Sequence, residues 1–71
     1  IISIMAKIQL NGKMLKIKEN LSIKDLLRKY KLNEKSVAIE LNGLILPKEN
    51  YKKKKIKNRD KIEIVHFIGG G

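Results

Sequence analysis

A chain of 71 residues is long enough for one small domain, and its composition excludes several classes of protein. Apolar residues make up 42% of the chain, which indicates a compact globule rather than a disordered tail. Cysteine is absent, so disulfides, a thiolate nucleophile and a cysteine-type zinc site are excluded, and the single histidine, His66, excludes a histidine-rich metal centre. A chain this short buries only about 60% of its unfolded surface and has little room for an enclosed active site. We therefore do not expect an enzyme.

The net charge of +10 raises the question of a polyanionic partner. However, the cations are fifteen lysines and only two arginines, and arginine is the residue that recognises phosphate and guanine in a bidentate manner. The three aromatic residues, Tyr30, Tyr51 and Phe67, are too widely spaced to stack a nucleic-acid strand. No apolar run approaches the roughly 20 residues that span a bilayer. We expect a solvated lysine surface, with neither nucleic acid nor membrane as a partner.

Residues 4–18 have the pattern of a β-hairpin. Ile4, Ala6, Ile8 and Leu10 alternate with more polar residues, a period of two that is typical of a half-buried strand. Asn11-Gly12 follows, and this pair favours a type I′ turn because both central positions need a positive φ. Alternation resumes over residues 13–18, where leucine and isoleucine at 15 and 17 are expected to point inward.

The period then changes to that of a helix. Ser22 is a candidate N-cap, with Asp25 three residues later in a capping-box position. The following residues are expected to form one apolar stripe that packs across the sheet: Ile23, Leu26, Leu27 and Tyr30. The helix is expected to end at Leu32-Asn33, since asparagine tolerates the left-handed conformation.

The second half of the chain predicts three further strands. Residues 37–41 alternate, Asn42-Gly43 is a second hairpin signal, and residues 44–46 end at a proline. Residues 48–51 are expected to form a helical turn or a loop, residues 52–55 are a run of lysines, and residues 58–60 have turn chemistry. The last strand is expected over residues 61–67, with Ile62 and Ile64 on one face and Glu63, Val65 and Phe67 on the other.

This order of elements predicts an α+β fold with a mixed five-stranded (or four-stranded) sheet and one main helix packed on one face. It is the element order of the ubiquitin-like β-grasp. Residues 1–67 are expected to form a single β-grasp domain, in which residues 1–4 are an extension before a start at Met5. Residues 68–71 are expected to form a flexible C-terminal glycine tail.

The glycine run, Gly69-Gly70-Gly71, directly follows the last predicted strand. Glycines have no side chains to add to a core, but they can lie extended in a narrow channel and place a terminal carboxylate in another protein's active site. ATP can activate such a carboxylate as an acyl adenylate, which a sulfur donor or an amine can then attack. The alternative is an unstructured end or a spacer.

Across nearly its full length the sequence resembles the ThiS family of sulfur carriers in thiamine biosynthesis. The resemblance is carried by residues 5–8, 10–13, 22–27, 37–43, 45–48, 51, 60–65 and the terminal glycines. It implies a carrier whose last glycine, Gly71, is adenylated by a ThiF-type enzyme that uses ATP, converted to a thiocarboxylate, and presented to thiazole synthase, ThiG. It also implies a sulfur donor such as a cysteine desulfurase, no bound cofactor, and a cytoplasmic location, or the plastid stroma if the gene is organellar.

On this interpretation Gly69 and Gly70 give the tail its reach, and Val65, Phe67 and Ile68 are candidates for partner docking, since exposed apolar residues beside the tail can anchor a partner. Ordinary packing is the alternative for Val65 and Phe67. The chain departs from the family in its third glycine, its strong positive charge and Arg59, where a glycine is common.

Two other functions are compatible with parts of the sequence. A MoaD-like sulfur carrier for molybdopterin synthesis shares the mechanism, but the short chain and the Glu40-x-Asn42-Gly43 run favour ThiS. The second half also resembles a basic S4-like RNA-binding module. That module needs two helices before its strands, whereas this sequence predicts a hairpin and one helix.

Overall fold

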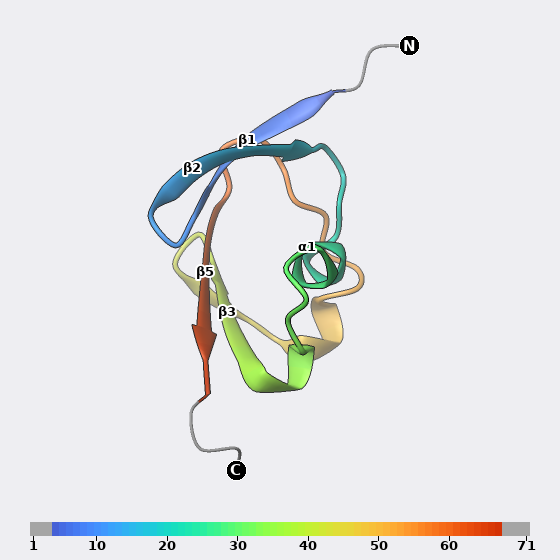
Figure 1. Ribbon diagram of the computed structural model, residues 1–71, viewed down its shortest axis with the longest axis vertical. Coiled ribbons are helices and arrows are strands. Elements are labelled where there is room, and N and C mark those ends of the chain that lie inside the picture. The colour runs from blue at the N-terminus through green and yellow to red at the C-terminus, as the bar shows by residue number, and fades with distance from the viewer. Residues whose placement is uncertain (1–3, 68–71) are drawn as a thin grey trace.

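A computed structural model describes residues 4–67, which form one mixed sheet with a single α-helix against one face (Figure 1). The elements follow the predicted order: β1 (Met5–Leu10), β2 (Lys13–Lys18), α1 (Ile23–Lys29), β3 (Val37–Leu41), β4 (Leu44–Leu46) and β5 (Lys61–His66). Two short 3-10 turns, Glu34–Ser36 and Lys48–Asn50, precede β3 and follow β4.

The sheet has five strands in the order β2-β1-β5-β3-β4, so the last strand of the chain lies in its centre. β5 is parallel to β1 and antiparallel to β3, and the two hairpins, β1–β2 and β3–β4, form the two outer parts of the sheet. This arrangement confirms the predicted mixed α+β sheet, in its five-stranded form.

Both Asn-Gly pairs form the predicted hairpin turns. Asn11 and Gly12 have φ values of 48° and 85°, and Asn42 and Gly43 have 54° and 86°. All four residues therefore have the positive φ that a type I′ turn requires.

The start of α1 is the predicted capping box. The Asp25 N–H donates to the Ser22 hydroxyl at 3.0 Å, and the Ser22 N–H donates to the Asp25 carboxylate at 3.1 Å. The bond from the Ser22 N–H to the carboxylate, helped by the Ser22 hydroxyl, favours the ionised form and holds the pKa of Asp25 below its ordinary value of 3.8. Asp25 thus stabilises the helix start by two bonds and a favourable dipole interaction.

The predicted end of the helix is wrong by one turn. α1 stops at Lys29, and Lys31, not Asn33, takes the left-handed conformation with a φ of 57°. The Leu32 N–H then donates to the Leu27 carbonyl at 2.8 Å and the Lys31 N–H to the Arg28 carbonyl at 3.0 Å, which is a Schellman ending. As a result Leu32 packs against the core, while Tyr30, expected in the apolar stripe, is 43% exposed.

The core lies between α1 and the sheet. Ile23, Leu26 and Leu27 of α1 are buried against strand residues of the inner face, which are Ala6, Ile8, Ile17, Val37, Ile39, Leu41 and Ile62. Tyr51 and Ile56, from the connection between β4 and β5, complete the core, although the sequence pattern gave no sign of their burial. Burial raises the pKa of the Tyr51 hydroxyl above its ordinary value.

The two outer strand boundaries differ from the prediction, and the turn before β5 forms in spite of its residue type. β1 begins at Met5, so Ile4 lies outside the strand and is 63% exposed rather than part of the inner face. β5 ends at His66, one residue earlier than expected. Arg59 adopts a φ of 71°, so the turn before β5 forms although its residue is not the glycine that this conformation favours.

The described residues contain one α-helix before the second hairpin, and it follows two paired strands. This topology contradicts the S4-like alternative, which requires two helices in that place. Within residues 4–67, no helix is long and apolar enough to cross a membrane.

Candidate functional site

The candidate site is the end of β5, where the chain leaves the sheet. Phe67 is the last residue that the structure describes; Ile68 and the glycines Gly69, Gly70 and Gly71, which the sequence predicts to be functional, lie outside the described residues. The site is therefore defined by what holds the base of the tail and by the surface around it.

The strand end is held from two sides. The Phe67 N–H donates to the Ser36 carbonyl at 2.9 Å, which continues the β3–β5 ladder by one residue beyond β5. The Lys48 ammonium lies 5.3 Å from the centroid of the Phe67 ring, within the range of a cation–π contact. Together these contacts hold Phe67 at the end of the strand.

The turn asparagines have a second role that the sequence analysis missed. Asn11 accepts a hydrogen bond from the Ile64 N–H at 2.7 Å and donates one to the Ile64 carbonyl at 3.3 Å, so its side chain replaces a strand residue beside β5. Asn42 accepts from the Lys61 N–H at 2.8 Å through its side chain and donates its own N–H to the Lys61 carbonyl at 2.7 Å. The two hairpin turns therefore clamp β5 at both ends of its buried segment.

Val65 and Phe67 lie on the outer face of the sheet, opposite α1, as their alternation with Ile62 and Ile64 predicts. Each is 55% exposed, so neither contributes to the core as ordinary packing would require. Val65 faces Ala38 across the β3–β5 ladder, and Phe67 follows it at the strand end. Their docking role stays a prediction, but both are accessible next to the start of the tail.

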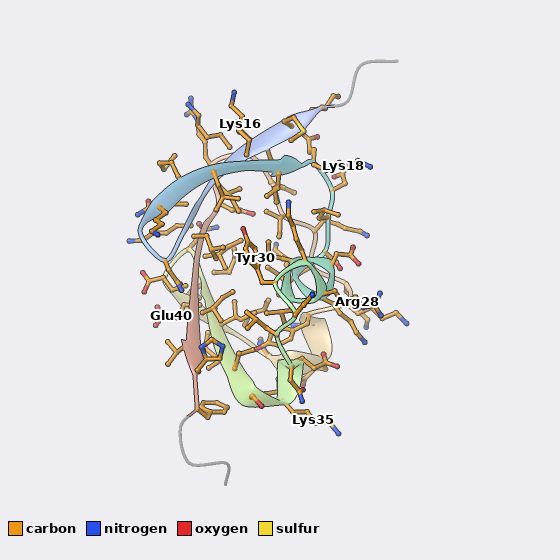
Figure 2. The ribbon with its side chains drawn as sticks, viewed as in Figure 1. Lys16, Lys18, Arg28, Tyr30, Lys35 and Glu40 are labelled. Atoms are coloured by element: carbon orange, nitrogen blue, oxygen red, sulfur yellow. The ribbon has the colours of Figure 1, made fainter. Side chains whose placement is uncertain are left out.

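The outer face is divided by charge. On the hairpin β1–β2, Lys7 is paired with Lys16. On the other half of the sheet Glu40 of β3 is paired with Glu63 of β5. Figure 2 shows Glu40 on the side of the sheet away from α1.

A groove lies beside β4, the strand at the edge of the sheet next to β3. It is lined by Leu41, Asn42, Leu44, Ile45, Leu46, Asn50, Lys53 and Lys54. Within residues 4–67 no group of three or more histidine, aspartate and glutamate side chains could hold a metal ion. The arrangement around β5 is suited to presenting a chain end to a partner.

Comparisons with known proteins identify the family. A family model described as "ThiS family" matches residues 8–71 of this chain. The chain belongs to the ThiS family. Among curated relatives, the sulfur carrier protein ThiS of Bacillus subtilis is 49% identical over 65 residues, which cover 90% of this chain and 98% of the relative. The match confirms the resemblance inferred from the sequence and identifies this ThiS-family chain as a small carrier rather than a catalyst.

Solved structures agree with this family. The crystal structure of the thiamine biosynthesis protein ThiS from Geobacter metallireducens matches with a TM-score of 0.78 and 32% identity, and the match covers 92% of this chain and 99% of that one. This match confirms the β-grasp fold of the ThiS family.

Two other relatives differ in name or in length. A protein named ycf40 and described as uncharacterised, from Porphyra purpurea, is 38% identical over 64 residues. A thiazole synthase from Paramagnetospirillum magneticum is 35% identical over 65 residues, which cover 92% of this chain but only 20% of that protein. A segment resembling this ThiS-family chain therefore occurs within a longer thiazole synthase.

Proposed function

We propose that this chain carries sulfur for thiazole formation in thiamine biosynthesis, with Gly71 as the residue that bears the sulfur. The observation that supports this most strongly is the family match, which extends through residue 71 and so includes the glycine run. The fold supports it as well, since β5, which the side chains of Asn11 and Asn42 bind by hydrogen bonds, is the last strand before that run in the sequence.

The proposed chemistry begins at the Gly71 carboxylate. A ThiF-type enzyme transfers AMP from ATP to this carboxylate and releases pyrophosphate, which gives an acyl adenylate. A sulfur nucleophile attacks the acyl carbon, forms a C–S bond and displaces AMP. Sulfide gives the thiocarboxylate directly, whereas a persulfide, such as that of a cysteine desulfurase, gives an acyl disulfide that a thiol must reduce to the thiocarboxylate.

The carrier's own contribution is presentation. Gly69 and Gly70 lack side chains that a narrow channel would exclude, and four extended residues after Phe67 span at most roughly 13–14 Å. Val65, Phe67 and Ile68 are proposed to dock on the partner, so that this reach ends at the reacting atoms. No cofactor is proposed to be bound by the carrier itself.

Thiazole synthase of the ThiG type is the proposed acceptor of the sulfur. The Paramagnetospirillum thiazole synthase supports this partner, because a segment similar to this chain forms part of that enzyme. The cytoplasm, or the plastid stroma for an organellar gene, is the proposed compartment.

Mass spectrometry of the intact chain tests this function. Incubation with ATP and a ThiF-type enzyme should add the mass of AMP less water, and further incubation with a sulfur donor should leave the gain expected for one oxygen replaced by sulfur. Deletion of Gly70-Gly71 should abolish both products and leave the thermal midpoint unchanged. Gly71→Ala is the control, because it changes the last residue but keeps the full length of the chain and its terminal carboxylate.

The same experiment separates the alternatives. The thiocarboxylate should donate sulfur in the presence of ThiG and not in the presence of the large subunit of molybdopterin synthase. Transfer only with the latter would support the MoaD-like alternative. A chain that forms no adenylate would contradict the proposed function.

A further inference from the structure

The two edges of the sheet differ in the side chains that they carry. β2, at one edge, has lysine at three of its six positions, and charged side chains on an edge strand oppose pairing with another chain. β4, at the other edge, is three residues long and carries no charge. Its Leu44 is 74% exposed and its Ile45 is 68% exposed. The β4 edge therefore lacks the charges by which the β2 edge opposes an added strand.

The backbone of β4 is open on the side away from β3. The Asn42 N–H bonds to the Lys61 carbonyl, so in the alternation of an antiparallel ladder Glu40 exchanges its hydrogen bonds with β5. Ile45, opposite Glu40, is then in a non-hydrogen-bonded pair, and its N–H and C=O point away from β3. Within residues 4–67 no strand pairs with β4 on that side. These two groups are available to a strand that adds to the edge.

An apolar groove of about 480 Å³ accompanies this edge, and its lining includes Leu41, Leu44 and Leu46. Leu41 and Leu44 are opposite each other in the ladder and so lie on the same face. Leu41 is 8% exposed and belongs to the core, whereas Leu44 is 74% exposed, so the apolar surface of the core continues uncovered to the sheet edge. A strand added to β4 would place every second side chain on this surface.

Lysines set the charge of the groove. Lys53 and Lys54 line it, and both are exposed. Neither takes part in the ion pairs of the described part of the chain. The surrounding connection, residues 47–60, contains seven of the seventeen basic residues and only two acidic ones. Carboxylates are therefore the complementary groups, whereas a second copy of this chain, with its own net charge of +10, would be repelled.

We propose that the β4 edge and its groove bind an extended acidic segment of another protein, which adds to the sheet as a further strand. The outward N–H and C=O of Ile45 bond to the backbone of that segment. Its apolar side chains pack on Leu44 and Leu46, and its flanking carboxylates pair with Lys53 and Lys54. The site does not include the glycine run, so the inference goes beyond the proposed function and does not depend on it.

A synthetic peptide tests the site. The probe is Glu-Thr-Leu-Thr-Leu-Thr-Glu, blocked at both ends. Its leucines and glutamates lie on one face of a strand, and its threonines favour the extended conformation. On titration into the isotope-labelled full chain, followed by NMR, we expect saturable binding with the largest amide shifts at residues 44–46 and 53–54. The same peptide with lysines in place of the glutamates should not bind.

Substitutions in the chain separate the contacts. The double substitution Lys53→Gln with Lys54→Gln should weaken the Kd for the acidic peptide about fivefold, through loss of two exposed ion pairs. Lys13→Gln with Lys16→Gln, on β2, removes the same charge and should leave the Kd unchanged. Ile45→Pro removes the outward N–H and no β3–β4 hydrogen bond, so it should bind about fivefold more weakly than Ile45→Ala, which keeps that N–H.

Each contrary result is specific. Failure of the acidic peptide to bind, equal binding of the lysine-containing peptide, or equal weakening by the two lysine pairs would overturn the site. Self-association of the free chain in sedimentation experiments, with shifts at β4, would overturn it as well, because the edge would then belong to a second copy. The two lysine pairs decide the question even if Ile45→Pro does not fold. Adenylation of Gly71 plays no part in these measurements, so the failure of either proposal leaves the other standing.

Discussion

The sheet has one face that α1 covers and one face that it leaves open. Both faces are built from the same five strands, but they differ in the residue types that they can carry. The covered face carries apolar side chains that are almost completely buried. The open face carries lysines on β1 and β2, two glutamates on β3 and β5, and exposed apolar residues such as Val65. Burial thus restricts the residue types of one face, and the other face is free to vary with its partners.

β5 contributes residues to both faces of the sheet. Ile62 points to the core, and Val65, three residues later, is exposed on the outer face beside the start of the tail. The strand is therefore a structural element on one side and a candidate docking surface on the other. Substitutions on the two sides should affect different measurements.

The largest effect is expected from Ile62→Ala. Ile62 is fully buried in the central strand, so its truncation should lower the free energy of unfolding by about 2–5 kcal/mol through lost burial and a cavity. Val65→Ala removes two methyl groups from the outer face of the same strand, and it should change the free energy of unfolding by no more than about 0.5 kcal/mol. Urea denaturation measures both, and comparable losses would show that the outer face is not open.

Phe67→Ala should affect binding more than stability, the opposite of Ile62→Ala. Truncation of an apolar anchor should weaken binding to the ThiF-type enzyme by about 2 kcal/mol, whereas stability should fall only by the roughly 0.5–1 kcal/mol of an exposed cation–π contact with Lys48. Met14→Ala is the control, because Met14 is also an exposed apolar residue, 62% accessible, but on the edge strand β2. If Met14→Ala weakens binding as much as Phe67→Ala, docking is not centred on the end of β5.

A smaller effect is expected at the start of α1, on the covered side. Ser22→Ala should lower the free energy of unfolding by about 1 kcal/mol at neutral pH, because it removes the N-cap bond to the Asp25 N–H.

The same capping box predicts a dependence on pH. The folded pKa of Asp25 is lowered, so the stability that its carboxylate contributes is present above pH 3.8 and is lost as the pH falls through the folded pKa. The difference in stability between wild type and Asp25→Asn should therefore narrow in acid. A difference independent of pH would contradict the capping box as the cause.

The sequence predicted those features that depend on neighbouring residues. Alternation located the strands, the Asn-Gly pairs located both turns, and Ser22 with Asp25 located the start of the helix. These signals are local, because each follows from backbone conformation or from the period of a single element.

The features that the sequence did not reveal depend on contacts between distant segments. The burial of Tyr51 and Ile56 follows from the path of the β4–β5 connection beneath α1, where the Ile23 N–H bonds to the Lys54 carbonyl. The Glu40–Glu63 pair exists only in the register of β3 with β5. At the helix end, Leu32 takes the place expected for Tyr30, because the Schellman ending reverses the chain one turn early.

The smallest expected effect concerns the turn that leads into β5. Arg59 has a φ of 71°, a conformation that costs a residue with a Cβ about 1–2 kcal/mol, so Arg59→Gly should relieve strain. Glycine also has more conformational entropy to lose on folding, which reduces the net gain to about 0.5–1 kcal/mol. The backbone bond from the Arg59 N–H to the Lys7 carbonyl, 2.7 Å, does not depend on the side chain.

The chain's other arginine supplies the control. Arg28 lies in α1, and Arg28→Gly removes the same charge but should cost about 1 kcal/mol, because glycine is a poor helix former. The two substitutions should therefore shift the urea midpoint in opposite directions. The Arg59 turn leads directly into β5. If Arg59→Gly raises the stability and leaves the affinity for the ThiF-type enzyme unchanged, the conformation of the turn matters at this position and the arginine side chain does not. Equal losses from both substitutions would mean that the Arg59 side chain stabilises the turn by more than its strain costs.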